Sequence, residues 1–196
     1  MNKSALITID VEDWFHLDYI QNKKYNSHET CLDGLYYFID FLKKKNIKGN
    51  FFFLDDILQQ IPEVAKKLCE EGHGIGSHGK SHVRPLIMEE KEFENEMKRC
   101  FENLTSILNC PNKKIGYRAP CFSLNDELLT IIKKIGFTYD SSFINFKSHP
   151  LYGEIKLEKF VNYADGIKKE ENFYEFEVST INIFKKNLPI SGGGYL

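Results

Sequence analysis

Short apolar runs alternate with longer amphipathic segments through the first two thirds of the chain. The apolar runs predict buried strands at 4–9, 49–54, 73–77, 115–117 and 137–139. Between them, apolar residues recur every three or four positions, which predicts helices at 32–45, 55–71, 88–108 and 125–134, with a break or kink at Pro62. This fourfold alternation predicts parallel βαβ units and an α/β fold.

The last third of the chain is less regular. Residues 148–167 predict an aromatic loop, and only 174–179 alternate as a strand, before a glycine-rich end at 191–196. No internal repeat or domain boundary is evident, so residues 1–196 are expected to form a single domain.

Composition excludes several functional classes. The 196 residues carry a net charge of −2, with lysines scattered rather than gathered in a stripe, which argues against a dedicated nucleic-acid binder. No apolar stretch has the length of a membrane span, and the N-terminus lacks the apolar region of a signal peptide. The five cysteines form no CxxC pair, and Cys31, Cys69 and Cys100 fall in helical patterns as expected buried thiols. We therefore expect a reducing, cytoplasmic setting.

Two histidines four residues apart, His78 and His82, lie in the segment GIGSHGKSH. They can face one point if the second half of the segment is helical, and imidazoles in that arrangement bind divalent transition metals. The alternative is a pair of exposed polar residues on a loop. An acidic cluster at 10–13 could add a carboxylate, giving three ligands with positions open for water or substrate.

Polar clusters follow four of the predicted strands: 10–13, 78–82, 118–122 and 140–142. In a parallel α/β barrel, these positions form the C-terminal face, where active sites lie. Arg118 could pair with a catalytic carboxylate and lower its pKa, although a surface salt bridge is the alternative. For Ser141 and Ser142, a turn-capping role is the first interpretation.

Four segments together resemble the ordered motifs of the polysaccharide deacetylases, the family with the NodB homology domain (carbohydrate esterase family four). They are TIDVEDWF at 8–15, GSHGKSH at 76–82, YRAPCFS at 117–123 and YDSS at 139–142. The DVEDWF form is similar to a subgroup associated with exopolysaccharide and lipid-linked glycan biosynthesis. The resemblance implies a distorted (β/α) barrel and a metal-dependent hydrolase that removes N-acetyl groups from amino sugars of a polysaccharide or glycan precursor.

The resemblance also implies roles for individual residues. Asp10 matches the general base and Arg118 the arginine that orients it, while His78 and His82 match the imidazole ligands of one divalent metal ion. Zinc is the first expectation for that ion, but manganese, nickel, cobalt or iron would also fit such ligands.

The carboxylate ligand is ambiguous. The family has two adjacent aspartates, whereas this chain has Glu12 and Asp13 after Asp10. Asp13 is preferred because its residue type matches, and Glu12 is the alternative. Substrate contacts are expected from Trp14, Pro120, Phe122, Asp140 and His149, and Tyr152 could also stack on a sugar face.

One departure from the family concerns the proton donor. The family carries a late histidine that protonates the leaving amine, but all six histidines here lie at or before position 149. Either the C-terminal strands are missing from this copy, or another residue or subunit supplies the acid. The alternatives are a non-sugar amidase of the same fold and a catalytically impaired glycan-binding module. The sequence does not define an oligomeric state.

Overall fold

An eight-stranded sheet forms the centre of the protein. The computed structural model describes residues 5–17, 20, 30–109, 114–146 and 149–190. The strands lie in the order β1 (Ile7–Val11), β2 (Gly49–Phe53), β3 (Gly74–Ser77), β4 (Ile115–Tyr117), β5 (Tyr139–Asp140), β8 (Phe173–Phe176), β7 (Ile167–Glu170) and β6 (Val161–Ala164). The first six of these run parallel, while β7 and β6 continue the sheet with antiparallel pairing. A separate hairpin consists of β9 (Thr180–Ile183) and β10 (Lys186–Pro189).

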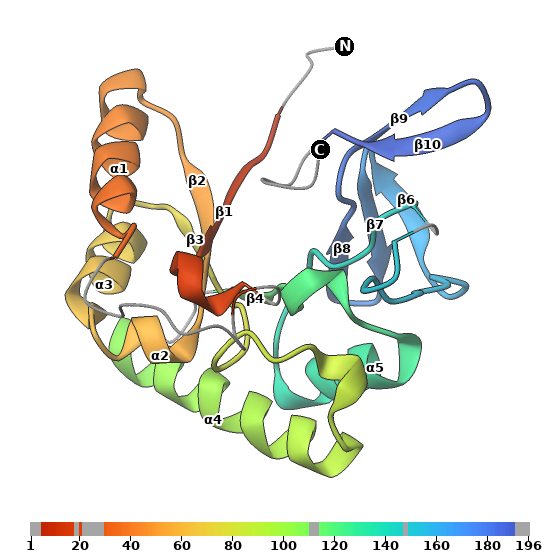
Figure 1. Ribbon diagram of the computed structural model, residues 1–196, viewed down its shortest axis with the longest axis horizontal. Helices are drawn as coiled ribbons and strands as arrows, with labels where there is room; N and C mark the ends of the chain where they lie inside the picture. The colour runs from red at the N-terminus through yellow and green to blue at the C-terminus, as the bar shows by residue number, and fades with distance from the viewer. Residues whose placement is uncertain (1–4, 18–19, 21–29, 110–113, 147–148, 191–196) are drawn as a thin grey trace.

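The helices lie along the outside of this sheet. They are α1 (Asp33–Lys45), α2 (Asp55–Leu58), α3 (Pro62–Glu70), α4 (Glu90–Leu108) and α5 (Asp126–Ile135), with short 3-10 turns η1 (Trp14–His16), η2 (Pro85–Ile87) and η3 (Pro120–Phe122). Figure 1 shows α1, α3, α4 and α5 in an arc around the strands, with the β9–β10 hairpin at the end away from α1. The α/β class is confirmed. No pairing joins β1 to β6 in the described part of the chain, so the sheet is open there rather than a closed barrel.

Local sequence signals explain the helix boundaries. The predicted break at Pro62 is confirmed, because α2 ends at Leu58 and Pro62 begins α3, where its missing N–H costs no helical hydrogen bond. Asn125 caps α5 by accepting the Leu128 N–H at 2.9 Å. Gly136 ends that helix with φ +119°, a conformation that favours glycine.

The C-terminal third contains more structure than the sequence predicts. The expected loop at 148–167 includes β6, and β7, β9 and β10 are further strands that the pattern does not reveal. All four residues of β6 are exposed, so no alternation of buried and exposed positions marks this strand. The signal that remains is Asp165–Gly166 at the β6–β7 turn, where Gly166 has φ +69°.

The core lies between the parallel strands and the helices. Phe51 and Phe53 from β2, Leu68 from α3, and Phe93 and Met97 from α4 are almost wholly buried. None of the helices that the structure describes is long and apolar enough to cross a membrane.

The free thiols differ in burial. Cys69 and Cys100 are buried as predicted. Cys31 is exposed, so that part of the prediction is wrong; it lies just before α1 rather than on an apolar helix face.

Replacing Gly76 with alanine tests how tightly β3 is packed between its neighbours. An added Cβ would lie 2.6 Å from the Phe52 ring and 2.8 Å from the Gly116 carbonyl oxygen. We expect Gly76→Ala to lower the free energy of unfolding by about 1–3 kcal/mol, measured by urea denaturation. Gly34→Ala is the control, because nothing lies within 4 Å of its Cβ in α1, and it should raise stability by roughly 0.5–1 kcal/mol. Equal stability of Gly76→Ala and the parent would contradict this packing.

Candidate active site

Asp10 and Glu12 reach the same side of the sheet because they are two residues apart on an extended chain. Val11, between them, is buried in the core and belongs to the opposite face. Asp13 also has an extended backbone, with φ −103° and ψ 158°, so its side chain points to the same face as that of Val11. The alternation thus puts the two candidate carboxylate ligands, Glu12 and Asp13, on opposite faces.

Glu12, His78 and His82 converge at the end of β1 and β3. Glu12 Oε2 lies 3.0 Å from His82 Nε2 and 3.9 Å from His78 Nε2. One ligand atom from each of the three residues lies within 4.8 Å of the others. Both imidazoles are buried, so these side chains form a compact, largely preformed group.

The two imidazoles meet through a loop, not through the helical turn predicted from their spacing. The His78 N–H extends the β2–β3 pairing by donating to the Phe53 carbonyl oxygen at 2.7 Å. The backbone then turns through Gly79, with φ +83°, and returns at His82, with φ +65°. A left-handed conformation at a residue with a Cβ costs about 1 kcal/mol or more, and the surrounding structure must hold it.

The protonation states of the two imidazoles suit metal coordination. His78 Nδ1 lies 2.8 Å from the Arg118 carbonyl oxygen, so Nδ1 donates there and the Nε2 lone pair faces Glu12. Burial lowers the pKa of His78, and burial together with His78 lowers the pKa of His82 to about 3. Both rings are therefore neutral at pH 7, which is the form that binds a metal. Two neutral nitrogens and one carboxylate oxygen fit a divalent transition metal.

Asp13 has a different role from the one predicted. Its carboxylate accepts the Trp14 N–H at 2.9 Å, the Cys31 N–H at 2.8 Å and the Thr30 hydroxyl. Burial raises its pKa, but these hydrogen bonds outweigh that effect and hold the pKa below its usual value. Asp13 caps η1 and ties it to the segment that leads into α1. The preferred ligand, Asp13, is therefore engaged in these structural hydrogen bonds, while the alternative, Glu12, lies with the imidazoles.

Arg118 holds Asp10 beside this group. Its Nη1 donates to Asp10 Oδ1 at 3.0 Å and to Thr8 Oγ1 at 2.9 Å. Its Nε and Nη2 donate to the carbonyl oxygen and hydroxyl of Ser141 at 3.0 and 2.7 Å, and its guanidinium stacks over Phe52. Burial raises the pKa of Asp10, but the charge and hydrogen bond of Arg118, together with His78 and His82, outweigh this effect and keep it below its usual value. Asp10 is therefore an ionised carboxylate at neutral pH.

Two residues expected to touch substrate are buried instead. Asp140 is fully buried, and its carboxylate accepts two hydrogen bonds from Ser142. Pro120 is also buried, at the start of η3. These two predicted substrate contacts are not supported, because neither side chain is accessible to a glycan.

A groove of about 520 Å³ contains two of the residues expected to bind a sugar, and a third, Phe122, lies beside it. His149 and Tyr152 line the groove, with their rings stacked at 4.0 Å between centroids. The Phe122 ring lies 5.4 Å from the Tyr152 ring and 5.7 Å from the Arg118 guanidinium, so it connects the groove to the site. Trp14 is half-buried on η1, and its expected contact with substrate stays a prediction.

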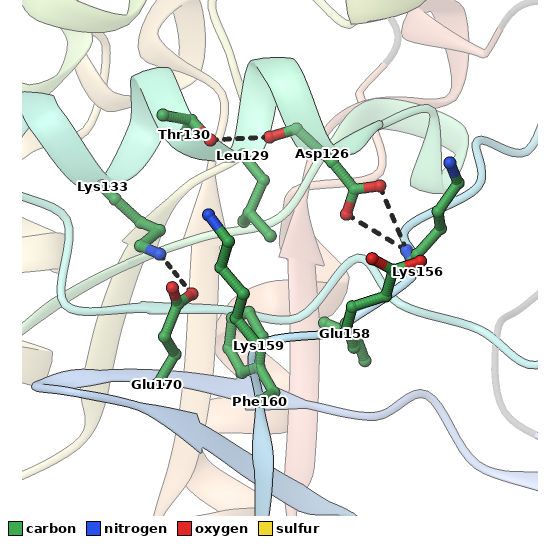
Figure 2. A pocket seen from close by; sticks show the side chains of 10 residues that line it. Asp126, Leu129, Thr130, Lys133, Lys156, Glu158, Lys159, Phe160 and Glu170 are labelled. Atoms are coloured by element: carbon green, nitrogen blue, oxygen red, sulfur yellow. Dashed lines mark hydrogen bonds and ion pairs between the residues drawn. The ribbon is translucent and has the colours of Figure 1, made fainter.

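A second hollow lies between α5 and the segment 156–160, and three of its charged side chains are engaged in structural contacts. Lys133 is paired with Glu170, and Asp126 accepts the Lys156 backbone N–H at 3.1 Å (Figure 2). None of the candidate site residues lines it. This hollow therefore joins two elements and is not the candidate site.

Comparisons with known proteins agree on one family. The profile described as "Polysaccharide deacetylase" matches residues 33–139, more than half of the chain. The chain is 34% identical over 84 residues to a peptidoglycan-N-acetylglucosamine deacetylase of Bacillus cereus, covering 43% of this chain and 28% of the relative. It spans less than half of the length of the curated relatives it matches.

Solved structures support the same fold. A protein from Mycobacterium smegmatis, assigned to the polysaccharide deacetylases, aligns with a TM-score of 0.60 and 22% identity over 89% of this chain and 58% of that one. A CE4 family pseudoenzyme from Bacillus anthracis aligns with a TM-score of 0.53 and 18% identity, over 67% of this chain and 40% of that one.

Alanine substitutions at positions 12 and 13 test which of the two carboxylates is the metal ligand. We expect Glu12→Ala to weaken zinc binding at least about 100-fold, as His78→Ala should, because each removes one of three ligands. Asp13→Ala should keep zinc affinity within a few-fold while lowering the free energy of unfolding by about 1–2 kcal/mol through loss of its cap. Titration calorimetry with zinc and urea denaturation measure the two effects. Zinc binding lost in Asp13→Ala but kept in Glu12→Ala would reverse the assignment.

Proposed function

The chain belongs to the polysaccharide deacetylase family, and we propose that it is a metal-dependent hydrolase that removes N-acetyl groups from the amino sugars of a glycan. The observation that carries the proposal is the convergence of Glu12, His78 and His82 beside the Asp10–Arg118 ion pair. This places a metal-ligand set next to an ionised carboxylate, which is the arrangement that metal-assisted amide hydrolysis needs.

Glu12, His78 and His82 would hold the cation, with zinc as the first ion to test. A bound divalent cation would supply a Lewis acid for an acetamide carbonyl and would lower the pKa of water. The Arg118 carbonyl fixes the His78 ring orientation, so the ligand set needs little rearrangement to bind an ion.

Asp10 is the proposed general base. It accepts a proton from the water that attacks the acetamide carbon. Arg118 keeps Asp10 ionised and fixes its position, since the guanidinium is itself held by Thr8 and Ser141. A carboxylate held in this way can accept a proton at neutral pH.

The groove lined by His149 and Tyr152 is the proposed binding place for a neighbouring sugar unit. Aromatic rings pack on the apolar faces of sugars, and Phe122 joins this groove to Arg118. Because the Bacillus cereus relative is named for peptidoglycan N-acetylglucosamine, peptidoglycan fragments and N-acetylglucosamine oligomers are the first substrates to test.

The second candidate function is a glycan-binding protein without turnover. It is favoured by one comparison, since a structure that aligns with 67% of this chain is that of a CE4 family pseudoenzyme from Bacillus anthracis. It predicts oligosaccharide binding with no acetate release, even with metal bound.

Asp10→Asn tests the base. The substitution keeps the shape of the side chain but removes the proton acceptor, so kcat for acetate release from N-acetylglucosamine oligomers should fall about 10²–10⁴-fold with zinc content unchanged. Asp40→Asn, on the exposed face of α1, is the matched control and should leave kcat unchanged. Full activity in Asp10→Asn would exclude this role. A zinc-loaded parent that binds oligomers but releases no acetate would favour the second candidate.

Tyr152→Ala tests the groove. Removing the ring that stacks on His149 should raise KM for oligomers about fivefold, corresponding to roughly 1 kcal/mol, with little change in kcat. Phe184→Ala, at the exposed tip of the β9–β10 hairpin, should change neither constant. An unchanged KM in Tyr152→Ala would place the sugar elsewhere.

A further inference from the structure

Two acidic side chains, Asp140 and Glu175, lie side by side in the interior. Asp140 ends β5 and Glu175 lies opposite it in the parallel register of β8. Both residues are fully buried. On β8, Glu175 occupies the same phase of the alternation as the core residue Phe173, so the sheet directs its carboxyl inward.

The hydrogen bonds around the pair are unequal. Asp140 accepts the Ser142 hydroxyl and the Ser142 N–H, both at 2.8 Å. Glu175 Oε1 accepts the Phe143 N–H at 2.9 Å. No N–H or hydroxyl donor among the described residues lies within hydrogen-bond distance of Glu175 Oε2. The groups that act on this side chain are the Asp140 carboxyl and the Phe143 and Ser142 N–H groups.

The cations nearby are bound to other groups. Arg118, on the segment after β4, donates to Asp10, Thr8 and the oxygens of Ser141. Lys168, the cross-strand neighbour of Glu175 on β7, lies 3.0 Å from Glu177. Tyr117 on β4 also faces Asp140, but burial raises the pKa of its phenol, which stays neutral.

Two adjacent carboxylates without a bound cation would carry a large electrostatic cost in the interior. Burial raises the pKa of Asp140 to about 6, and burial together with the Asp140 charge raises that of Glu175 well above its usual value.

We propose that Glu175 keeps its proton at neutral pH and donates it to Asp140, and that this hydrogen-bonded pair positions Arg118 through residues 141–143. Ser142, bound to Asp140, also accepts the Ala119 N–H at 2.9 Å with its hydroxyl oxygen. Ser141, the next residue toward Asp140, holds two groups of the Arg118 guanidinium. Asp140 and Glu175 are thus positioning residues that act on Asp10 through Arg118.

The first test is the pH dependence of unfolding, which needs no catalytic activity. Because the pKa of Glu175 is higher in the folded protein, its proton stabilises the fold fully below the unfolded pKa of about 4.5 and progressively less as pH rises. This one proton should make the unfolding equilibrium constant increase up to tenfold per pH unit above that value.

Glu175→Gln isolates this proton. The glutamine amide can donate to Asp140 and its carbonyl can accept the Phe143 N–H, but it does not titrate. Urea unfolding between pH 5 and 8 should therefore show a slope lower by up to one proton in Glu175→Gln than in the parent. Glu177→Gln, one residue beyond the end of β8 and ion-paired with Lys168, should keep the parent slope. If the free energy of unfolding of Glu175→Gln has the same pH dependence as that of the parent, the protonated pair is overturned.

The positioning role rests on the proposed function and is tested separately. Glu175→Gln should keep kcat and KM for acetate release near the parent values, whereas Glu175→Leu should lower kcat about tenfold with KM little changed. If Glu175→Leu does not fold, an unchanged kcat in Glu175→Gln still supports the hydrogen-bonded pair, and a tenfold loss there overturns it. An inactive parent would refute the proposed function alone, because the unfolding slopes would still decide the proton assignment.

Discussion

Arg118 is the residue on which the rest of the site depends. Its backbone carbonyl orients the His78 ring, while its side chain holds Asp10 and two groups of Ser141. A single buried arginine therefore connects the metal-ligand candidate, the proposed base and the segment after β5. A lysine could not replace it, because Arg118 makes four hydrogen bonds from three separate nitrogens of a planar group, whereas an ammonium has three donors on one nitrogen.

The parallel sheet explains why these groups meet. β1, β3, β4 and β5 place the acidic residues, the histidines, Arg118 and Ser141 at the same edge, which the strand–helix alternation predicts without a structure. The sequence also contained a signal that bears on the choice between Glu12 and Asp13. Asp10, Val11 and Glu12 alternate, so a buried Val11 puts Asp10 and Glu12 together; matching by residue type favoured Asp13 because it ignored this alternation. The loop geometry at His82 could not be predicted, since its left-handed backbone follows from tertiary contacts rather than from spacing.

The C-terminal strands were harder to predict for a physical reason. β6 is exposed throughout and β9 and β10 are mostly exposed, so their apolar residues follow no pattern set by a core. Glu175 was missed as a functional residue for a related reason. The segment YEFEV reads as an ordinary alternating strand, yet Glu175 falls on the phase of buried Phe173, and a charged residue on a core phase is itself a signal.

The carboxyl groups at this edge of the sheet have different surroundings. Asp10 is neutralised by a guanidinium, and Asp13 is stabilised by N–H and hydroxyl donors at a helix start. Asp140 is stabilised by Ser142 and by the proton of Glu175. Glu12 lies against two imidazoles that burial keeps neutral and that could bind a cation together with it. The proposed roles of Glu12 as metal ligand and of Asp10 as proton acceptor therefore follow from the groups around each carboxylate, more than from the identity of any one motif.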